Sequence, residues 1–440
     1  MNGAVKRDGS EMDEIKDQIH ESLAKDIDLL DASVVQGDSA KLAELRQRIE
    51  SAAQSLIAER GFVGSAEALA RLKEEVVSEA VGLGAIESFM RDPDVTEIMV
   101  NGPDNIYVER NGLIERTNKR FSNEKQLRLV IERIITPLGR RVDESAPMVD
   151  ARLPDGSRVN AIIAPLSLDG ATLTIRRFGS RRLTGDDLLA KNSATNEVLD
   201  FLRACVQARL NIVVSGGTGS GKTTLLNILS AYLPSRERIV TIEDAAELCL
   251  NQPHVIRLES RPSNLEGKGQ ITIRDLVRNA LRMRPDRIVV GECRGAEALD
   301  MLQAMNTGHD GSLTTIHANT ARDAISRIET MVLMAGFDLP VRAIREQISS
   351  SIDVVIQTAR LRDGSRKITS ISEVIGMEGD VVTMQELLRF VQHGVDSSER
   401  VRGDFVTTGV QPAAVARFRE YGVDFDARTF AALPKVAGIW

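Results

Sequence analysis

One short stretch of the chain combines glycines, a lysine and threonines at a spacing that suits phosphate chemistry. Residues 216–224 read Gly-Gly-Thr-Gly-Ser-Gly-Lys-Thr-Thr, between an apolar strand-like segment at 211–215 and an apolar helical segment at 222–233. Glycines allow backbone N–H groups to come close to a phosphate, and the positive end of the following helix faces the anion. The pattern therefore predicts a P-loop that binds ATP or GTP together with Mg²⁺.

The residues of this loop have separate predicted roles. Lys222 is a candidate catalytic residue because its ammonium can reach the terminal phosphates, and the Thr223 hydroxyl is the candidate magnesium ligand. The alternative interpretation is a glycine-rich turn without a ligand. The predicted nucleotide-binding residues are Gly216, Gly217, Thr218, Gly219, Ser220, Gly221, Lys222, Thr223 and Thr224.

Two acidic positions follow predicted strands further along the chain. Glu243 closes the segment Thr-Ile-Glu-Asp at 241–244, and Glu292 follows Gly291 after an apolar run. In an open parallel sheet the ligand binds at the carboxyl ends of the strands, so a carboxylate there lies near the phosphates. Because hydrolysis needs a group that orients water, both glutamates are candidate catalytic residues. A solvated strand end is the alternative for either one.

Two histidines, His309 and His317, bracket a further predicted strand. A zinc site is a poor explanation because no third ligand stands at a suitable spacing. Structural hydrogen bonding is one interpretation. The other is that the sheet brings both histidines to the terminal phosphate, which makes His317 a candidate catalytic residue.

The composition limits the class of protein. The chain has 440 residues, of which 42% are hydrophobic, 27% charged and 3% aromatic, and a net charge of −7. This composition is typical of a soluble α/β protein with two or three domains, and the acidic balance disfavours nucleic acid as the substrate. No apolar run approaches the roughly 18 residues that cross a bilayer, and the polar N-terminus is no secretory signal. Three isolated cysteines without metal-site spacing favour the reducing cytoplasm.

The pattern of elements predicts an α/β fold. Residues 194–375 alternate strand and helix, which indicates a mainly parallel sheet with helices on both faces. Strands are expected there at 211–215, 239–242, 255–258, 287–290, 312–316 and 353–358. The predicted division is a helical, charged segment at 1–83, a smaller α+β domain at 84–180, a linker at 181–193, the nucleotide-binding domain at 194–375 and a C-terminal extension at 376–440.

Together these motifs resemble the secretion ATPases of type II and type IV systems, which are RecA-like motors. The four marks of that family are a P-loop, an acidic box, a Gly-Glu strand end and a histidine box, here at 216–223, 241–244, 291–292 and 307–317. The segments 92–112, 376–380 and 401–403 resemble the CpaF branch, which drives tight-adherence (Tad/Flp) pili. The resemblance covers roughly residues 84–410.

The resemblance implies roles for named residues. Glu292 would polarise the attacking water, and Glu243 would support it and the magnesium. Gly291 stands where the acidic strand ordinarily ends in Asp, which implies metal contact through water. Arg158 and Arg176, from the smaller domain, would reach the γ-phosphate; surface solubility is their alternative.

The resemblance also implies partners and a mechanism. The protein would be a cytoplasmic ATPase that forms a hexameric ring, binds ATP between its two domains and works on an inner-membrane platform protein. The four-cysteine zinc module of the type II branch is absent, so no zinc is expected. Three alternatives stay open: an ATPase of a conjugative or effector-exporting type IV system, a nucleic-acid translocase and a scaffold that binds ATP without hydrolysing it.

Overall fold

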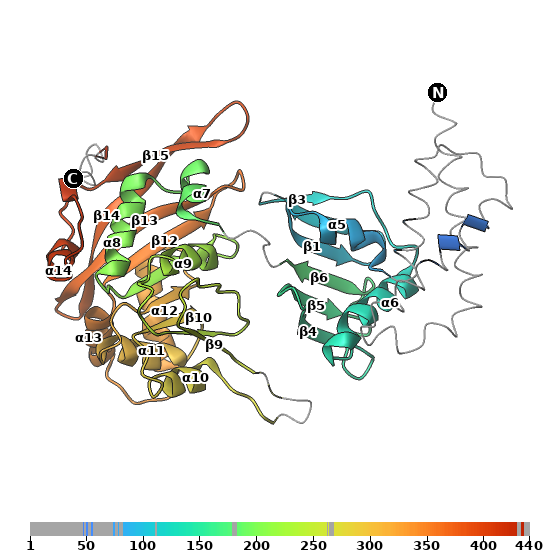
Figure 1. The fold of residues 1–440 in the computed structure, drawn as a ribbon, viewed down its shortest axis with the longest axis horizontal. Coiled ribbons are helices and arrows are strands. Elements are labelled where there is room, and N and C mark those ends of the chain that lie inside the picture. Colours follow the sequence, from blue (N-terminus) through green and yellow to red (C-terminus); the bar gives the residue numbers. More distant parts are fainter. Residues whose placement is uncertain are drawn as a thin grey trace. The chain divides into compact units, whose positions relative to one another are not determined.

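The protein is described by a computed structural model that covers residues 82–110, 112–177, 183–261, 263, 268–428 and 433–434, and isolated positions between 47 and 78. The predicted helical segment at 1–83 therefore lies almost entirely outside the described residues. The chain divides into two compact units, Met1–Ser180 and Arg181–Trp440 (Figure 1).

The first unit is an antiparallel sheet with a helix against it. Its strands are β1 (Val95–Asn101), β2 (Ile106–Arg110), β3 (Leu113–Arg116), β4 (Met148–Arg152), β5 (Arg158–Ile162) and β6 (Thr172–Arg176), and their order is β3-β2-β1-β6-β5-β4. Its helical elements are η2 (Gly84–Ile86), α5 (Glu87–Arg91), α6 (Glu124–Ile135) and η3 (Thr136–Leu138). The side chain of Asn123 caps α6, and Leu127, Val130 and Ile131 of that helix join the buried core.

The second unit contains a nine-stranded sheet in the order β15-β14-β13-β12-β7-β11-β10-β8-β9. Its strands are β7 (Ile212–Gly216), β8 (Ile239–Glu243), β9 (Val255–Glu259), β10 (Arg287–Cys293), β11 (Leu313–Ile316), β12 (Val354–Arg360), β13 (Arg366–Glu378), β14 (Val381–Val395) and β15 (Val401–Thr407). Its helices are α7 (Gly185–Ala190), α8 (Asn196–Gln207), α9 (Lys222–Ser230), α10 (Ile273–Ala280), α11 (Glu297–Asn306), α12 (Ala321–Leu333), α13 (Val341–Ser351) and α14 (Ala414–Glu420).

Helices cover both faces of this sheet. Successive strand residues point to opposite faces, and β7 follows this rule: Ile212 and Val214 pack with α8, α9 and α14, whereas Val213 packs with α10 to α13. The strands from β12 to β9 pair in parallel, and β7, the fifth strand of the nine-stranded sheet, lies between β12 and β11. All six strands predicted for this region are present. The predicted α/β fold class is therefore confirmed.

Two predicted boundaries differ from the structure. The boundary at residue 375 falls inside β13, because β13, β14 and β15 continue the same sheet as antiparallel hairpins. The sheet was predicted from alternating strands and helices. The hairpins of β13, β14 and β15 contain no helices, so this alternation ends before the sheet does. The segment predicted as a linker, 181–193, contains α7.

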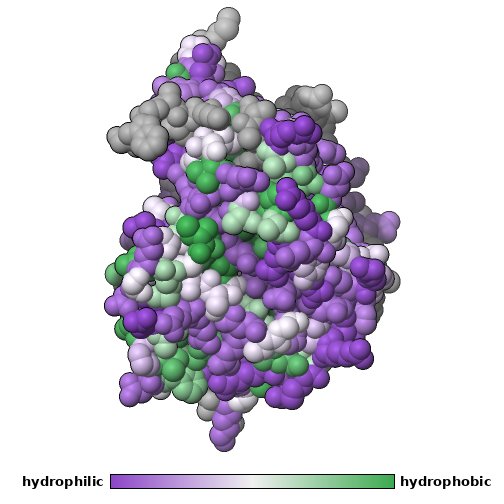
Figure 2. All heavy atoms as spheres, turned by 90° about the vertical axis from the view of Figure 1, so that its left-hand side faces the viewer, coloured by the Kyte–Doolittle hydropathy of each residue, from purple (hydrophilic) through white to green (hydrophobic). Residues whose placement is uncertain are grey.

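The surface in Figure 2 is largely hydrophilic, as the 27% of charged residues in the chain leads one to expect. This face is interrupted by smaller hydrophobic areas. Within the part of the chain that the structure describes, no helix is both long and apolar enough to cross a membrane.

Candidate nucleotide-binding site

The P-loop follows the central strand β7 and requires glycine at several positions. A Cβ at Gly216 would lie 2.6 Å from the carbonyl oxygen of Thr358, so no larger residue fits. Gly219 and Gly221 have φ angles of +69° and +95°, the left-handed region that glycine adopts without strain. Gly217 has open space where a Cβ would stand. The loop leads into the N-terminus of α9, where backbone N–H groups without a partner in the helix can bind a phosphate.

Two side chains stabilise the loop from within. Lys222, the first residue of α9, donates from Nζ to the carbonyl oxygen of Gly217 at 3.1 Å. The Ser220 hydroxyl lies 2.8 Å from the same oxygen and 3.0 Å from the Thr358 hydroxyl of β12, and the Ser220 side chain is buried. Ser220 thus fastens the loop to β12, and its contact with a phosphate, through its backbone N–H, stays a prediction.

Two arginines that the sequence did not single out lie against the P-loop. Arg366, at the start of β13, donates from Nε to the carbonyl oxygen of Gly219 at 2.8 Å. Arg360, its partner across the β12–β13 hairpin, lies 3.5 Å from the point where a Cβ of Gly219 would stand. The Asp363-Gly364 turn between the two strands is the signal that could have predicted the hairpin.

Glu243 ends β8 at the carboxyl edge of the sheet and is 3% exposed. Its carboxylate accepts hydrogen bonds from the backbone N–H groups of Glu247, at 2.8 Å, and of Leu248, at 3.0 and 3.2 Å. The carboxylate therefore anchors the loop that follows β8. Burial raises the pKa of Glu243 to about 7, and the two backbone hydrogen bonds oppose part of that rise.

Gly291 leaves the space that Glu243 fills. The two residues follow the paired positions Val290 and Ile242 of neighbouring strands β10 and β8. A Cβ at Gly291 would lie 2.8 Å from Cγ of Glu243, closer than real Cβ contacts. A larger residue at position 291, such as Asp, would therefore require the Glu243 side chain to move. The carbonyl oxygen of Gly291 accepts from the Thr315 hydroxyl at 2.7 Å, which links β10 to β11.

The raised pKa of Glu243 predicts a dependence of stability on pH. The folded state holds the proton more tightly than the unfolded state, whose reference pKa is 4.5. Stability is therefore lost as pH rises from 4.5 through about 7, by up to about 3 kcal/mol. We expect Glu243→Gln, which is always neutral, to lose this dependence and to unfold at a higher urea concentration than the parent at pH 8.

Urea midpoints measured between pH 5 and pH 8 test this expectation. The matched control is Glu259→Gln, because Glu259 is exposed at the end of β9 and accepts from the backbone N–H of Ala246. The control should keep the pH dependence of the parent. An equal pH slope in Glu243→Gln and the parent would contradict the assignment.

Glu292, near the end of β10, is held by the neighbouring arginine. Arg294 donates to the same carboxylate oxygen of Glu292 from Nε at 2.9 Å and from Nη2 at 2.6 Å. Its Nη1 also lies 3.6 Å from the carboxylate of Asp244, in the acidic box. Arg294 thus joins the two acidic motifs and fixes the orientation of Glu292.

The structure separates the two histidines. His317 directly follows β11 at the carboxyl edge, level with the P-loop, because Ile316 pairs with Ser215. His309 precedes the strand, on the opposite edge, and β11 alone spans about 13 Å. The expectation that both histidines lie near the phosphate site is therefore wrong for His309. The carbonyl oxygen of His309 accepts from the Ser312 hydroxyl at 2.7 Å, which is a structural role.

Arg158 and Arg176 are neighbours in the first unit. They are paired residues of the adjacent strands β5 and β6, and Arg152 of β4 pairs with Arg158. Three arginines therefore stand in a row across one end of the sheet. Arg158 is half-buried and Arg176 is exposed.

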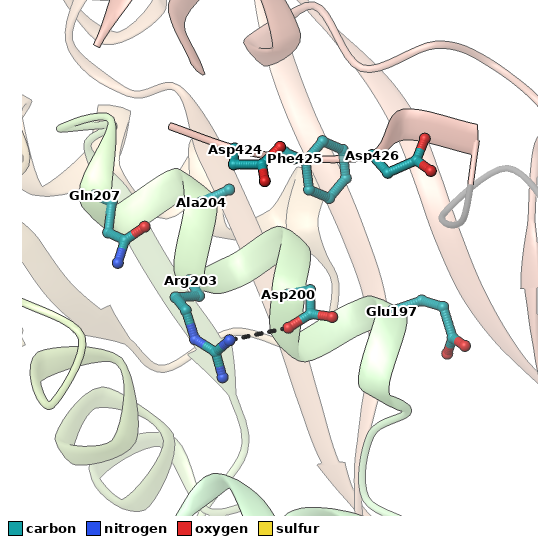
Figure 3. A pocket seen from close by; sticks show the side chains of 8 residues that line it. All are labelled: Glu197, Asp200, Arg203, Ala204, Gln207, Asp424, Phe425 and Asp426. Carbon is teal, nitrogen blue, oxygen red and sulfur yellow. Dashed lines mark hydrogen bonds and ion pairs between the residues drawn. The ribbon is translucent and has the colours of Figure 1, made fainter. Parts of the chain in front are cut away.

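A separate pocket of about 280 Å³ lies between α8 and residues 424–426. Figure 3 shows that Glu197, Asp200 and Arg203 project from α8 beside it, and that Asp200 pairs with Arg203. Asp424 and Asp426 add two further carboxylates on the other side. The excess of negative charge is unfavourable for phosphates. This pocket is therefore not the nucleotide site.

The site fits magnesium in the manner of a P-loop. Within the described ranges, no group of three or more His, Cys, Asp and Glu side chains could hold a metal ion by itself. Mg²⁺ in such sites is held largely by phosphate oxygens and water, with one hydroxyl from the loop. Thr223 in the first turn of α9 is half-buried and is placed to supply that hydroxyl.

The strand, glycine-rich loop and helix at 212–230 have the arrangement expected of a P-loop, and comparison with known proteins gives the family of the chain. The family model described as type II/IV secretion system protein matches residues 79–394. A Mycobacterium tuberculosis protein that is provisionally described as a conjugal transfer protein is 37% identical to this chain. The match covers 73% of this chain and 92% of that protein. The type IV secretion system protein VirB11 of Bartonella henselae is 31% identical over 68% of this chain and 93% of its own.

Among solved structures, the VirB11 ATPase of Brucella suis is 30% identical, covers 65% of this chain and 94% of its own, and has a TM-score of 0.36. The chain belongs to the type II/IV secretion system protein family. Membership of this family confirms the predicted enzyme class, an ATPase.

Proposed function

We propose that the chain is the motor ATPase of a Tad/Flp-type pilus assembly machine. It acts as a hexameric ring in the cytoplasm, at an inner-membrane platform protein. The observation that carries the motor function is the single sheet edge that holds the P-loop, Glu292 and His317. The resemblance of segments 92–112, 376–380 and 401–403 to the CpaF branch supports the pilus assignment.

In the proposed mechanism, the residues at the carboxyl edge of the sheet have different roles. Backbone N–H groups of 217–222 bind the phosphates, and Lys222 leaves the Gly217 carbonyl to contact the β- and γ-phosphates. Thr223 would hold Mg²⁺, which supplies a positive charge on the phosphate oxygens. Glu292 accepts a hydrogen bond from the attacking water and orients it for in-line attack.

The positive charge on the transferred phosphoryl group comes from arginine in this proposal. The planar guanidinium groups of Arg158 and Arg176 suit the charge that spreads over the equatorial oxygens in the transition state. His317 contacts the terminal phosphate, and because it directly follows β11, the position of that strand depends on whether the phosphate is bound. Loss of the γ-phosphate after hydrolysis removes these contacts, and the resulting change between the two units is the mechanical step.

The second candidate is an ATPase of a conjugative or effector-exporting type IV system. The names of the relatives favour it, because they refer to conjugal transfer and to type IV secretion. The chemistry at the P-loop is the same in both cases. The partner protein distinguishes them.

The test of this proposal is phosphate release by the purified full-length protein. It is measured after separate addition of the pilus platform protein, of an inner-membrane component of a conjugation system, and of DNA. We expect the pilus platform protein to stimulate turnover severalfold, as a partner that binds the active state better should. Stimulation by the inner-membrane component of a conjugation system, and not by the pilus platform, would favour the second candidate. Stimulation by DNA with a steep salt dependence would indicate a nucleic-acid translocase. Absence of any turnover in the assembled ring would contradict all three.

A further inference from the structure

We infer that Arg366 and Lys367, the first two residues of β13, connect the P-loop to helix α7 and act as positioning residues in the ATPase cycle. Arg366 contacts the P-loop, and Lys367 holds the C-terminal end of α7. The inference rests on the proposed function, because it states how the nucleotide state of the loop reaches the segment that follows the first unit.

The contact of Arg366 with the P-loop is with its backbone. Its Nε–H bonds the carbonyl oxygen of Gly219, and its Cδ lies 3.4 Å from the point where a Cβ of Gly221 would stand. In a P-loop the N–H groups turn toward the phosphates, so carbonyl groups such as this one turn outward. A change of the loop backbone on phosphate binding therefore moves or strengthens the bond to Arg366.

Lys367 points to the other side of the strand and is only 7% exposed. Its ammonium donates to the carbonyl oxygen of Asn192 at 2.6 Å and lies 3.5 Å from that of Lys191. The ring of Phe390 lies 5.7 Å from the same nitrogen. Burial lowers the pKa of Lys367. A buried ammonium held mainly by carbonyl oxygens is sensitive to the position of those oxygens.

Helix α7 depends on this contact. It has six residues, too few for an isolated helix to be stable in water. Its N-terminus is closed by a capping box between Thr184 and Asp187. Directly after its C-terminus Asn192 adopts a φ of +50°, and the ammonium of Lys367 binds the carbonyl oxygen of this residue, at the end of the helix that carries negative partial charge.

The backbone reinforces the connection. The N–H of Ile368 donates to the carbonyl oxygen of Ser193 at 3.0 Å, so three successive residues of β13 make contact with the P-loop or with 191–193. Consecutive Cα atoms are 3.8 Å apart in a rigid strand, so a shift of Arg366 is carried directly to Lys367. α7 is thus placed to respond to the occupancy of the P-loop.

Hydrogen exchange of the full-length protein tests the inference. The amides of 185–193 are compared with and without Mg²⁺ and a non-hydrolysable ATP analogue. We expect the analogue to slow their exchange severalfold in the parent. Lys367→Met keeps the length and the apolar stem of the side chain, and its loss of a charged hydrogen bond should speed exchange of these amides about tenfold or more without nucleotide.

The same variant should lose the response to nucleotide while its affinity for the analogue stays within about threefold of the parent, since Lys367 touches neither loop nor phosphate. Lys191→Met is the control for Lys367→Met, because Lys191 is exposed and only its carbonyl takes part. Arg366→Gln should weaken the response as well. Arg362→Gln, in the exposed turn of the same hairpin, should leave it unchanged.

Two results would overturn the inference and leave the proposed function intact. One is an unchanged exchange of 185–193 in a parent protein whose residues 216–224 gain protection from the analogue and which releases phosphate. The other is a full nucleotide response in Lys367→Met. If 216–224 gain no protection and no phosphate is released, the proposed function fails, and the inference fails with it.

Discussion

Replacement of Lys222 by alanine should abolish ATP hydrolysis and lower turnover at least about a thousandfold. The lysine ammonium bonds the Gly217 carbonyl in the loop and is therefore placed where the phosphates bind. Alanine removes its charge from the transferred phosphoryl group but leaves the backbone of the loop in place. Phosphate release at saturating Mg²⁺ and ATP measures the effect, and pilus assembly in cells should stop as well.

The control for this prediction is Lys191→Ala, which removes an exposed lysine that follows α7. It should keep full turnover. Circular dichroism should show the same helix content for Lys222→Ala as for the parent, because the lysine side chain is not part of the buried hydrophobic core. Persistent turnover in a folded Lys222→Ala protein would show that hydrolysis occurs elsewhere.

Glu292→Gln should separate binding from hydrolysis. The amide keeps the size of the side chain, but it is a much weaker acceptor for the proton of the attacking water, so turnover should fall about a hundredfold or more. Nucleotide affinity should change only severalfold, because Glu292 faces the water and not the base or ribose in the proposed mechanism. Turnover and equilibrium binding of a fluorescent ATP analogue measure the two effects.

The matched control is Glu346→Gln, on the exposed side of α13, where the carboxylate pairs with Arg342. It should change neither quantity. Equal losses in affinity and in turnover for Glu292→Gln would assign Glu292 to nucleotide binding. Unchanged turnover would exclude it as the residue that orients water.

The P-loop and the acidic strand ends could be predicted because their signals are local. The glycines of 216–221 stand between a buried strand and a helix. The strand, loop and helix together span fewer than twenty residues, so a short stretch of sequence is enough to recognise them. Glu243 and Glu292 each follow an apolar run, and parallel strands bring their carboxyl ends to one edge. The fold class follows from the same alternation.

The remaining features depend on contacts between distant residues. Arg366 reaches Gly219 across 147 positions of sequence, and nothing near either residue predicts that bond. The anchoring role of Glu243 depends on where the loop of Glu247 and Leu248 folds back. His309 was misplaced because a strand of four residues is long enough to put its two ends on opposite edges of the sheet.

The steric contact between Gly291 and Glu243 also constrains how this site can evolve. An aspartate at position 291 needs the volume that the glutamate at position 243 occupies. A chain with an aspartate at position 291 must therefore also have a shorter or displaced side chain at position 243. Either change alone leaves this space crowded or unfilled, so substitutions at the two positions should be tolerated best when they occur together.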